Sequence, residues 1–218
     1  METTTALDAR AWIDGFIAVI AARSAELTEL DRQAGDGDYG TNLRSALRRT
    51  ETNLNGVADD SPEAVFTAVS DAFLNTGGTS GPLFGMWFRE FAKAADGEPT
   101  TATLAEGAAN AVAAVQRLGK AEVGHKTMVD AMAPAAEALA AAAARGADLP
   151  EALRETAAAA HAGARSTEEL LAQRGRASYV GEHARGSSIR ARSPSPCSST
   201  PRSPPSSRSD HGRRRRRA

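Results

Sequence analysis

The sequence has little of what marks secreted, membrane-spanning or disulfide-rich proteins. Its 218 residues include one cysteine, Cys197, so a disulfide framework is excluded. The N-terminus has neither the positively charged segment nor the apolar run of a signal peptide. The longest apolar stretch, residues 131–144, is mostly alanine and contains Pro134 and Glu137, which argues against a membrane span. These absences predict a cytoplasmic protein.

Aromatic residues are also scarce, at 5% of the chain, although 41% of the residues are hydrophobic. A chain of this length can bury a substantial core without cross-links, but that core must consist mainly of Ala, Leu, Val and Ile. The length allows one domain, or one domain and a tail.

The net charge of −1 hides a sharp division along the chain. Residues 187–218 hold nine arginines against one acid, together with ten serines and five of the ten prolines. Such a segment cannot bury enough apolar surface to offset its ordering entropy. We therefore predict an acidic folded domain over residues 1–186 and a disordered basic tail over 187–218.

Hydrophobic residues in the acidic part recur at intervals of three and four, which predicts helices throughout. The residue pattern contains no alternating β-branched run, so no strand is expected. The class is all-α, a bundle or barrel of antiparallel helices joined by glycine loops. Helices are predicted over residues 7–30, 41–53, 61–75, 82–91, 103–118, 126–145 and 150–173.

Three carboxylates, those of Asp31, Asp36 and Asp38, lie within eight residues where the first helix ends. Carboxylates are disfavoured at a helix C-terminus, and a hard cation such as Mg²⁺ would offset their repulsion. Asp and Gly are also ordinary turn residues, so a solvated turn is the alternative.

A second loop, Gly77-Gly78-Thr79-Ser80-Gly81, precedes Pro82 at the start of a helix. Backbone N–H groups at a helix N-terminus that side chains do not shield can bind an anion. A plain helix C-cap and turn would account for the glycines equally well. No Gly-Lys-Ser/Thr follows, so this is not a Walker A loop.

Two further glycine loops carry polar groups, over residues 124–130 and 175–179. Each is weak evidence alone. Four such loops on one helical scaffold predict a single site at the helix ends.

The order of these motifs closely resembles the nucleotide-binding L subunit, or L domain, of dihydroxyacetone kinases. The resemblance covers about residues 7–186. The residues that carry it are Leu30-Asp31, Gly35 to Asn42, Gly77 to Gly85, Gly119 to Glu122, Lys126 to Asp130 and Gly175 to Glu182.

The resemblance implies a barrel of eight antiparallel helices that binds ADP or ATP at one end. It further implies that Asp31, Asp36 and Asp38 hold two Mg²⁺ ions bridging the nucleotide phosphates. The positions implied to contact the nucleotide are Tyr39, Gly40, Thr41, Asn42, Gly77, Gly78, Thr79, Ser80, Gly119, Met128 and Arg176, with Met128 against the adenine. Tyr39 stands where the family often has His, and His125 where it often has Asp.

The resemblance also implies partners. In the family a separate K subunit holds dihydroxyacetone, and no K domain fits within 218 residues. A lone L subunit favours the phosphoenolpyruvate-dependent phosphotransferase system with a phosphohistidine donor protein, and we also expect a homodimer. An ATP-dependent two-chain kinase, a domain of another keto-sugar or fatty-acid kinase, and nucleic-acid binding through the basic tail are the alternatives.

The resemblance stops after Gly186, where the family continues with Asp-Pro-Gly-Ala and an eighth helix. Residues 187–192 can be back-translated as TCG-TCG-ATC-CGG-GCG-CGG. A shift of two bases then reads Val-Asp-Pro-Gly-Ala. We expect the tail to be a frameshift product. The eighth helix would then be missing, the chain prone to aggregation and nucleotide binding weak.

Overall fold

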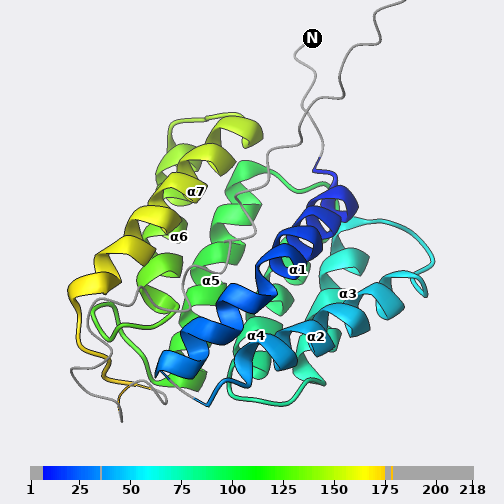
Figure 1. Ribbon diagram of the computed structural model, residues 1–218. Coiled ribbons are helices and arrows are strands. Elements are labelled where there is room, and N and C mark those ends of the chain that lie inside the picture. The colour runs from blue at the N-terminus through cyan, green and yellow to red at the C-terminus, as the bar shows by residue number, and fades with distance from the viewer. Residues whose placement is uncertain (1–6, 35, 175–177, 179–218) are drawn as a thin grey trace, which may run out of the picture.

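The computed structural model describes residues 7–34, 36–174 and 178 (Figure 1). This part of the chain contains α-helices, one short 3₁₀ helix and no strand. The elements are α1 (Ala9–Ala34), α2 (Tyr39–Leu54), α3 (Pro62–Leu74), α4 (Ser80–Ala94), α5 (Thr101–Gly119), α6 (Val129–Ala144), α7 (Leu149–Ser166) and η1 (Thr167–Glu169). The all-α prediction is confirmed.

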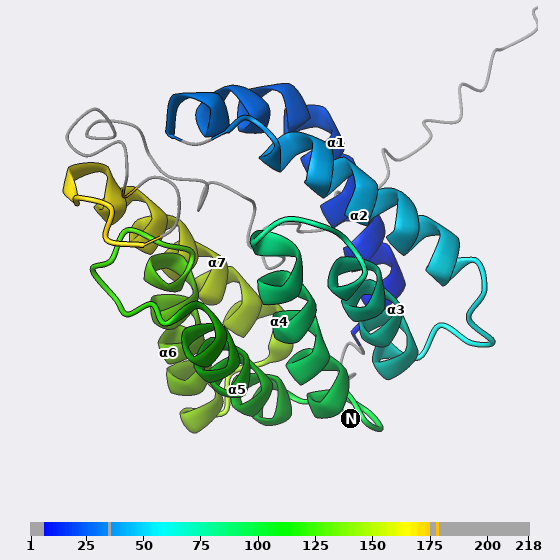
Figure 2. The ribbon, with the colours of Figure 1, turned by 90° about the horizontal axis from the view of Figure 1, so that it is seen from below.

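Each helix packs against the next one along the chain, and short connections make neighbours antiparallel (Figures 1 and 2). Helices α1 and α7 are not among the closely packed pairs, and Figure 2 shows them standing apart at the two ends of the succession of helices. The predicted loss of an eighth helix and the disordered tail over 187–218 fall outside the described residues.

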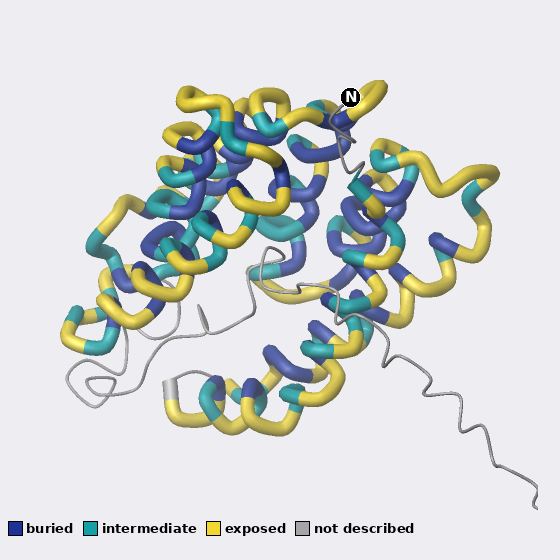
Figure 3. The backbone as a smooth tube through the Cα atoms, turned by 90° about the horizontal axis from the view of Figure 1, so that it is seen from above, coloured by how far each residue is buried: buried dark blue, intermediate teal, exposed yellow. Residues whose placement is uncertain are grey.

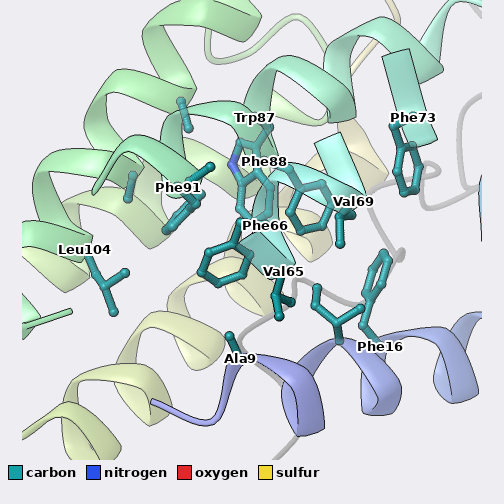
Figure 4. Close-up of a cluster of buried hydrophobic side chains, with 14 of the residues drawn as sticks. Ala9, Phe16, Val65, Phe66, Val69, Phe73, Trp87, Phe88, Phe91 and Leu104 are labelled. Carbon is teal, nitrogen blue, oxygen red and sulfur yellow. The ribbon is translucent and has the colours of Figure 1, made fainter. Parts of the chain in front are cut away.

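Aromatic side chains concentrate where α1, α3 and α4 meet (Figure 4). Phe88 is fully buried and contacts the rings of Phe16, Phe73 and Trp87 edge-on or tilted. Helices α5, α6 and α7 instead bury mainly alanine and leucine. The buried positions face inward along every helix, as Figure 3 shows, and leave the exposed ones on the outside.

Several helix boundaries differ from the predicted ones, and α1 continues to Ala34 and α4 to Ala94 rather than ending at residues 30 and 91. Helix α6 begins at Val129 rather than near residue 126, because Lys126 has a left-handed φ of 58° that interrupts the helix. Helix α7 ends at Ser166 rather than at residue 173. The Ser166 and Thr167 hydroxyls donate to the carbonyls of Gly163 and Ala164, which satisfies acceptors of the last turn.

The two ends of the bundle differ in how the helices begin. Helices α3, α5 and α7 start with capping side chains, those of Ser61, Thr100 and Asp148. The N-cap residues of α2, α4 and α6 make no side-chain capping bond. Among the described residues, no helix is both long and apolar enough to cross a membrane.

Candidate functional site

The loops that carry the predicted site residues gather at one end of the bundle. Because the helices alternate in direction, α1, α3 and α5 end where α2, α4 and α6 begin (Figures 1 and 2). The positive ends of three helix dipoles and the negative ends of three others therefore lie here, so an anion would be favoured only where it meets the first turns of α2, α4 or α6.

Asp31 lies in the last turn of α1 and is only 1% exposed. Its Oδ2 accepts a hydrogen bond of 3.0 Å from the backbone N–H of Tyr39, the first residue of α2. Asp36 and Asp38 are exposed on the loop, with the Asp38 N–H 3.4 Å from Asp36 Oδ1. Gly37 between them has a φ of +77°. The buried carboxylate thus lies beneath the junction of two helices, and the other two lie at the surface.

The donor chemistry of these carboxylates suits Mg²⁺, which prefers oxygen ligands. Over residues 7–34, 36–174 and 178, however, no three His, Cys, Asp or Glu side chains are grouped so that they could hold a metal ion. Binding would require the Gly37 loop to bring Asp36 and Asp38 toward Asp31. The assignment of these three residues to a metal stays a prediction.

The first turn of α2 divides its predicted site residues between the core and the surface. The Tyr39 side chain is 5% exposed and belongs to the core, and Gly40 lies where a β-carbon would collide with Thr28 of α1. Thr41 is exposed and its hydroxyl accepts a 3.2 Å bond from Arg44. Thr41 and Asn42 are therefore better placed than the Tyr39 ring to meet a ligand.

Asn42 lies directly against the second glycine loop. A β-carbon on Gly78 would stand 2.7 Å from Asn42 Nδ2, and Gly78 has a φ of +89°. The backbone angle therefore favours glycine at this position, and any larger residue would push the end of the Asn42 side chain aside. The tertiary structure joins the two loops that the sequence separates by 35 residues.

The second loop leads into α4 without a side-chain cap. Gly77 and Thr79 are exposed, Ser80 is half-buried, and the Thr79 N-cap makes no capping bond. A β-carbon on Gly81 would stand 2.6 Å from the carbonyl oxygen of Thr76, so the chain turns tightly into the helix. No N-cap side chain covers the backbone N–H groups at this helix start, as an anion-binding turn requires.

The third loop joins α5 to α6 and also reaches α4. A β-carbon on Gly119 would be 3.5 Å from Leu83, in the first turns of α4. Met128 is half-buried and packs against the core at the start of α6. Gly119 and Met128 thus border the same end of the bundle as the first two loops, whereas Arg176 falls outside the described residues.

Asp130 is an organising residue to which the motif pattern assigned no role. It is 3% exposed and accepts hydrogen bonds from the backbone N–H groups of Gly124 and Thr127. The spacing Thr127-x-x-Asp130 is close to that of a capping box, and that signal could have identified it.

Lys126 lies between those two anchored residues and is 2% exposed. Burial lowers the pKa of Lys126, and the negative charge of Glu168 acts in the opposite direction. The neighbouring His125 accepts a 3.1 Å bond at its carbonyl from the N–H of Gln173. The segment after α7 is thereby attached to the third loop.

Residues 33–188 match the family described as DAK2 domain. The chain belongs to this family. It is 33% identical over 178 residues to the ADP-binding subunit of the PEP-dependent dihydroxyacetone kinase of Escherichia coli, covering 80% of this chain and 85% of that protein. It is 39% identical over 174 residues to the corresponding subunit of kinase 2 of Listeria innocua, covering 78% of this chain and 80% of that protein.

Solved structures share the fold. The native dihydroxyacetone kinase of C. freundii aligns over 90% of this chain with a TM-score of 0.64 at 22% identity. The same enzyme in complex with AMP-PNP and Mg²⁺ aligns over 88% with a TM-score of 0.60 at 22% identity. The chain spans about a third of the length of those two proteins, at 35% and 34%.

Proposed function

We propose that this chain is the nucleotide-binding subunit of a dihydroxyacetone kinase and holds ADP or ATP at the end where α2, α4 and α6 begin. The observation that carries the proposal is the contact of Asn42 with Gly78. It joins the Asp loop to the glycine loop beside the starts of α2 and α4, whose N-cap residues make no side-chain capping bond. The names of the relatives from E. coli and L. innocua support the assignment.

The phosphates would lie against the first turns of α2 and α4. Backbone N–H groups near Ser80 and the polar side chains of Thr41, Asn42 and Thr79 would donate to phosphate oxygens, while Tyr39 and Gly40 set the position of that turn. The bare backbone at Gly77 and Gly78 would let phosphate oxygens approach closely. Phosphoryl transfer depends mainly on such positioning and charge neutralisation.

Asp31, Asp36 and Asp38 would hold two Mg²⁺ ions beside those phosphates. Bound Mg²⁺ neutralises phosphate charge and orients the transferred group. The chain itself contributes a rigid buried carboxylate at Asp31, whose hydrogen bond to the Tyr39 N–H aligns it with the start of α2. The other two carboxylates lie on the exposed loop around Gly37.

The nucleoside would lie toward the third loop, with Met128 against the adenine and Gly119 beside it. Met suits this position because its flexible apolar side chain adapts to a ring face. Arg176 would supply a cation to the nucleotide from the last motif.

The phosphoryl acceptor would be dihydroxyacetone on a separate K subunit. We further propose that a phosphohistidine protein of the phosphoenolpyruvate-dependent phosphotransferase system recharges the bound ADP, and that the subunit is a cytoplasmic homodimer. A relative in Lactococcus lactis, 32% identical over 176 residues, is named a PTS-dependent kinase subunit and supports this reading.

Another keto-sugar could replace dihydroxyacetone. An L-erythrulose kinase of Pectobacterium atrosepticum is 31% identical over 173 residues, so this domain type serves more than one named kinase. Phosphorylation assays with each sugar and the co-purified partner chain would distinguish the acceptors.

Calorimetry of the folded protein with ADP in the presence and absence of Mg²⁺ tests the proposal. Saturable binding that requires Mg²⁺ is expected. A folded sample that binds no ADP would contradict it. Salt-sensitive binding to DNA without ADP binding would instead favour the nucleic-acid alternative.

A further inference from the structure

We infer that Asp130 is a positioning residue for the nucleoside side of the site. It fixes the backbone of residues 124–127 and, through that loop, the segment that follows α7. The inference rests on the proposed function, because it takes the third loop as the nucleoside side of the pocket.

The Asp130 carboxylate uses both oxygens on the loop that precedes it. Oδ1 accepts from the Gly124 N–H and Oδ2 accepts from the Thr127 N–H at 2.7 Å. Charge-assisted bonds of this kind are stronger than neutral ones, and both are made by a side chain that is 3% exposed. The loop is therefore held at two points from the first turn of α6, on either side of His125 and Lys126.

The same stretch of loop is attached to the chain beyond α7. Lys126 is buried between the two anchored residues and is attracted by Glu168 in η1. The Gln173 N–H donates to the His125 carbonyl at 3.1 Å. Releasing the Asp130 bonds would therefore loosen the third loop and its attachment to residues 168–173 together.

Met128 is the residue through which the anchoring of this loop would affect a bound nucleotide. It follows Thr127, whose N–H bonds Asp130 and whose hydroxyl accepts a 3.2 Å bond from the Val129 N–H. Met128 is thus flanked by anchored residues on both sides. Its half-buried side chain packs against the core, and its backbone position is set by the anchored residues of the loop.

Asp130→Asn tests the inference, because it preserves volume but replaces one acceptor oxygen with an N–H₂ donor that faces a backbone N–H. Two readouts separate positioning from general stability. Hydrogen exchange of the Gly124, Thr127 and Gln173 amides reports the anchoring. Calorimetry with Mg-ADP and with Mg-pyrophosphate distinguishes the nucleoside side from the phosphate side.

We expect faster exchange at those three amides and a loss of about tenfold in ADP affinity, since a buried donor loses its acceptor. Pyrophosphate affinity should stay within about twofold, because its contacts lie on the other loops. Asp148→Asn, at an exposed carboxylate, is the control for the substitution itself. Asp148 likewise accepts a 2.7 Å backbone bond at a helix start, but at the opposite end of the bundle. Equal losses for ADP and pyrophosphate, or unchanged amide exchange, would overturn the inference.

A second pair of variants applies if Asp130→Asn does not fold. Glu168→Gln removes the charge that attracts Lys126, and exposed Glu169→Gln is its neighbouring control. We expect about threefold weaker ADP binding for the first variant only, with pyrophosphate binding unchanged. Identical behaviour of the two variants would contradict the attachment. Wild-type protein that binds pyrophosphate but no ADP would refute the proposed function. In that case amide exchange would still show whether Asp130 anchors the loop.

Discussion

Asn42 and Gly78 lie so close that a β-carbon on the glycine would stand 2.7 Å from the asparagine Nδ2. This relationship joins the start of α2 to the turn before α4, and it makes the two loops one surface. Their glycines and polar groups can therefore serve one ligand.

Gly78→Val should weaken nucleotide binding at least about tenfold, because the side chain would push Asn42 aside and the backbone angle would become strained. Gly97→Val is the matched control. Gly97 has a φ of +87°, close to the +89° of Gly78, but nothing lies within 4 Å of its β-carbon position. Both variants carry the backbone strain, and only the first crowds the site. Calorimetry that finds the same ADP affinity for both would show that this loop does not bind the phosphates.

Asp36→Asn should abolish tight Mg-dependent ADP binding and leave the helices intact. The substitution removes charge from an exposed loop carboxylate at nearly constant volume. Relief of carboxylate repulsion should leave thermal stability without nucleotide unchanged or slightly raised. Asp96→Asn, on an exposed loop at the other end, should bind as the wild type does. An Asp36 variant with wild-type affinity would remove this residue from the metal assignment.

Gly163→Ala should destabilise the packing of α6 on α7 by about 1–3 kcal/mol. The added carbon would collide with the carbonyl oxygen of Asp130 and lie 2.9 Å from Pro134 Cγ. Pro134 has no N–H to donate to that carbonyl, so the backbone there lies open to close approach by α7. Urea unfolding measures the effect, with exposed Ala158→Gly showing the cost of helix propensity alone. A stabilised Gly163→Ala protein would show that the two helices can move apart freely.

Lys126 should make stability rise with pH on the alkaline side. Its pKa in the folded protein is lowered by burial from the ordinary 10.5, so the unfolded chain binds the proton more tightly. The free energy of unfolding of the wild type, minus that of Lys126→Met, should therefore increase as pH rises toward 10.5. Urea unfolding of both proteins across this range measures the difference. A difference that is constant or falls with pH would mean that the lysine pKa is not depressed.

The coding frame after residue 186 is open to a direct check. We predict that resequencing the gene reveals an Asp-Pro-Gly-Ala sequence in another frame, and that restoring this frame raises both the melting temperature and the ADP affinity. The family match ends at residue 188, and α1 and α7 are not closely packed on each other. A confirmed frame without that motif in either alternative would end the hypothesis.

The sequence by itself determined that the described part is helical, where most helices lie, and which loops carry polar groups. Periodicity and glycine position are local signals, and they suffice for elements such as α3, where Ser61 and Pro62 mark the start. The motif order also pointed to the family, since its loops are short and distinct.

Only the tertiary structure decided which of these residues meet. The contact of Asn42 with Gly78 depends on the packing of α2, α3 and α4, and no local pattern specifies it. Asp130 lies between these cases, because the Thr127-x-x-Asp130 spacing points to its bond with the Thr127 N–H, whereas its bond with the Gly124 N–H becomes apparent only in the folded loop. Helix α7 was predicted too long because residues 168–173 are all good helix formers, whereas side-chain bonds to the Gly163 and Ala164 carbonyls help to end it. Long-range packing and side-chain capping contribute free energies that depend on the three-dimensional arrangement of the chain. A local residue pattern does not reveal these contributions.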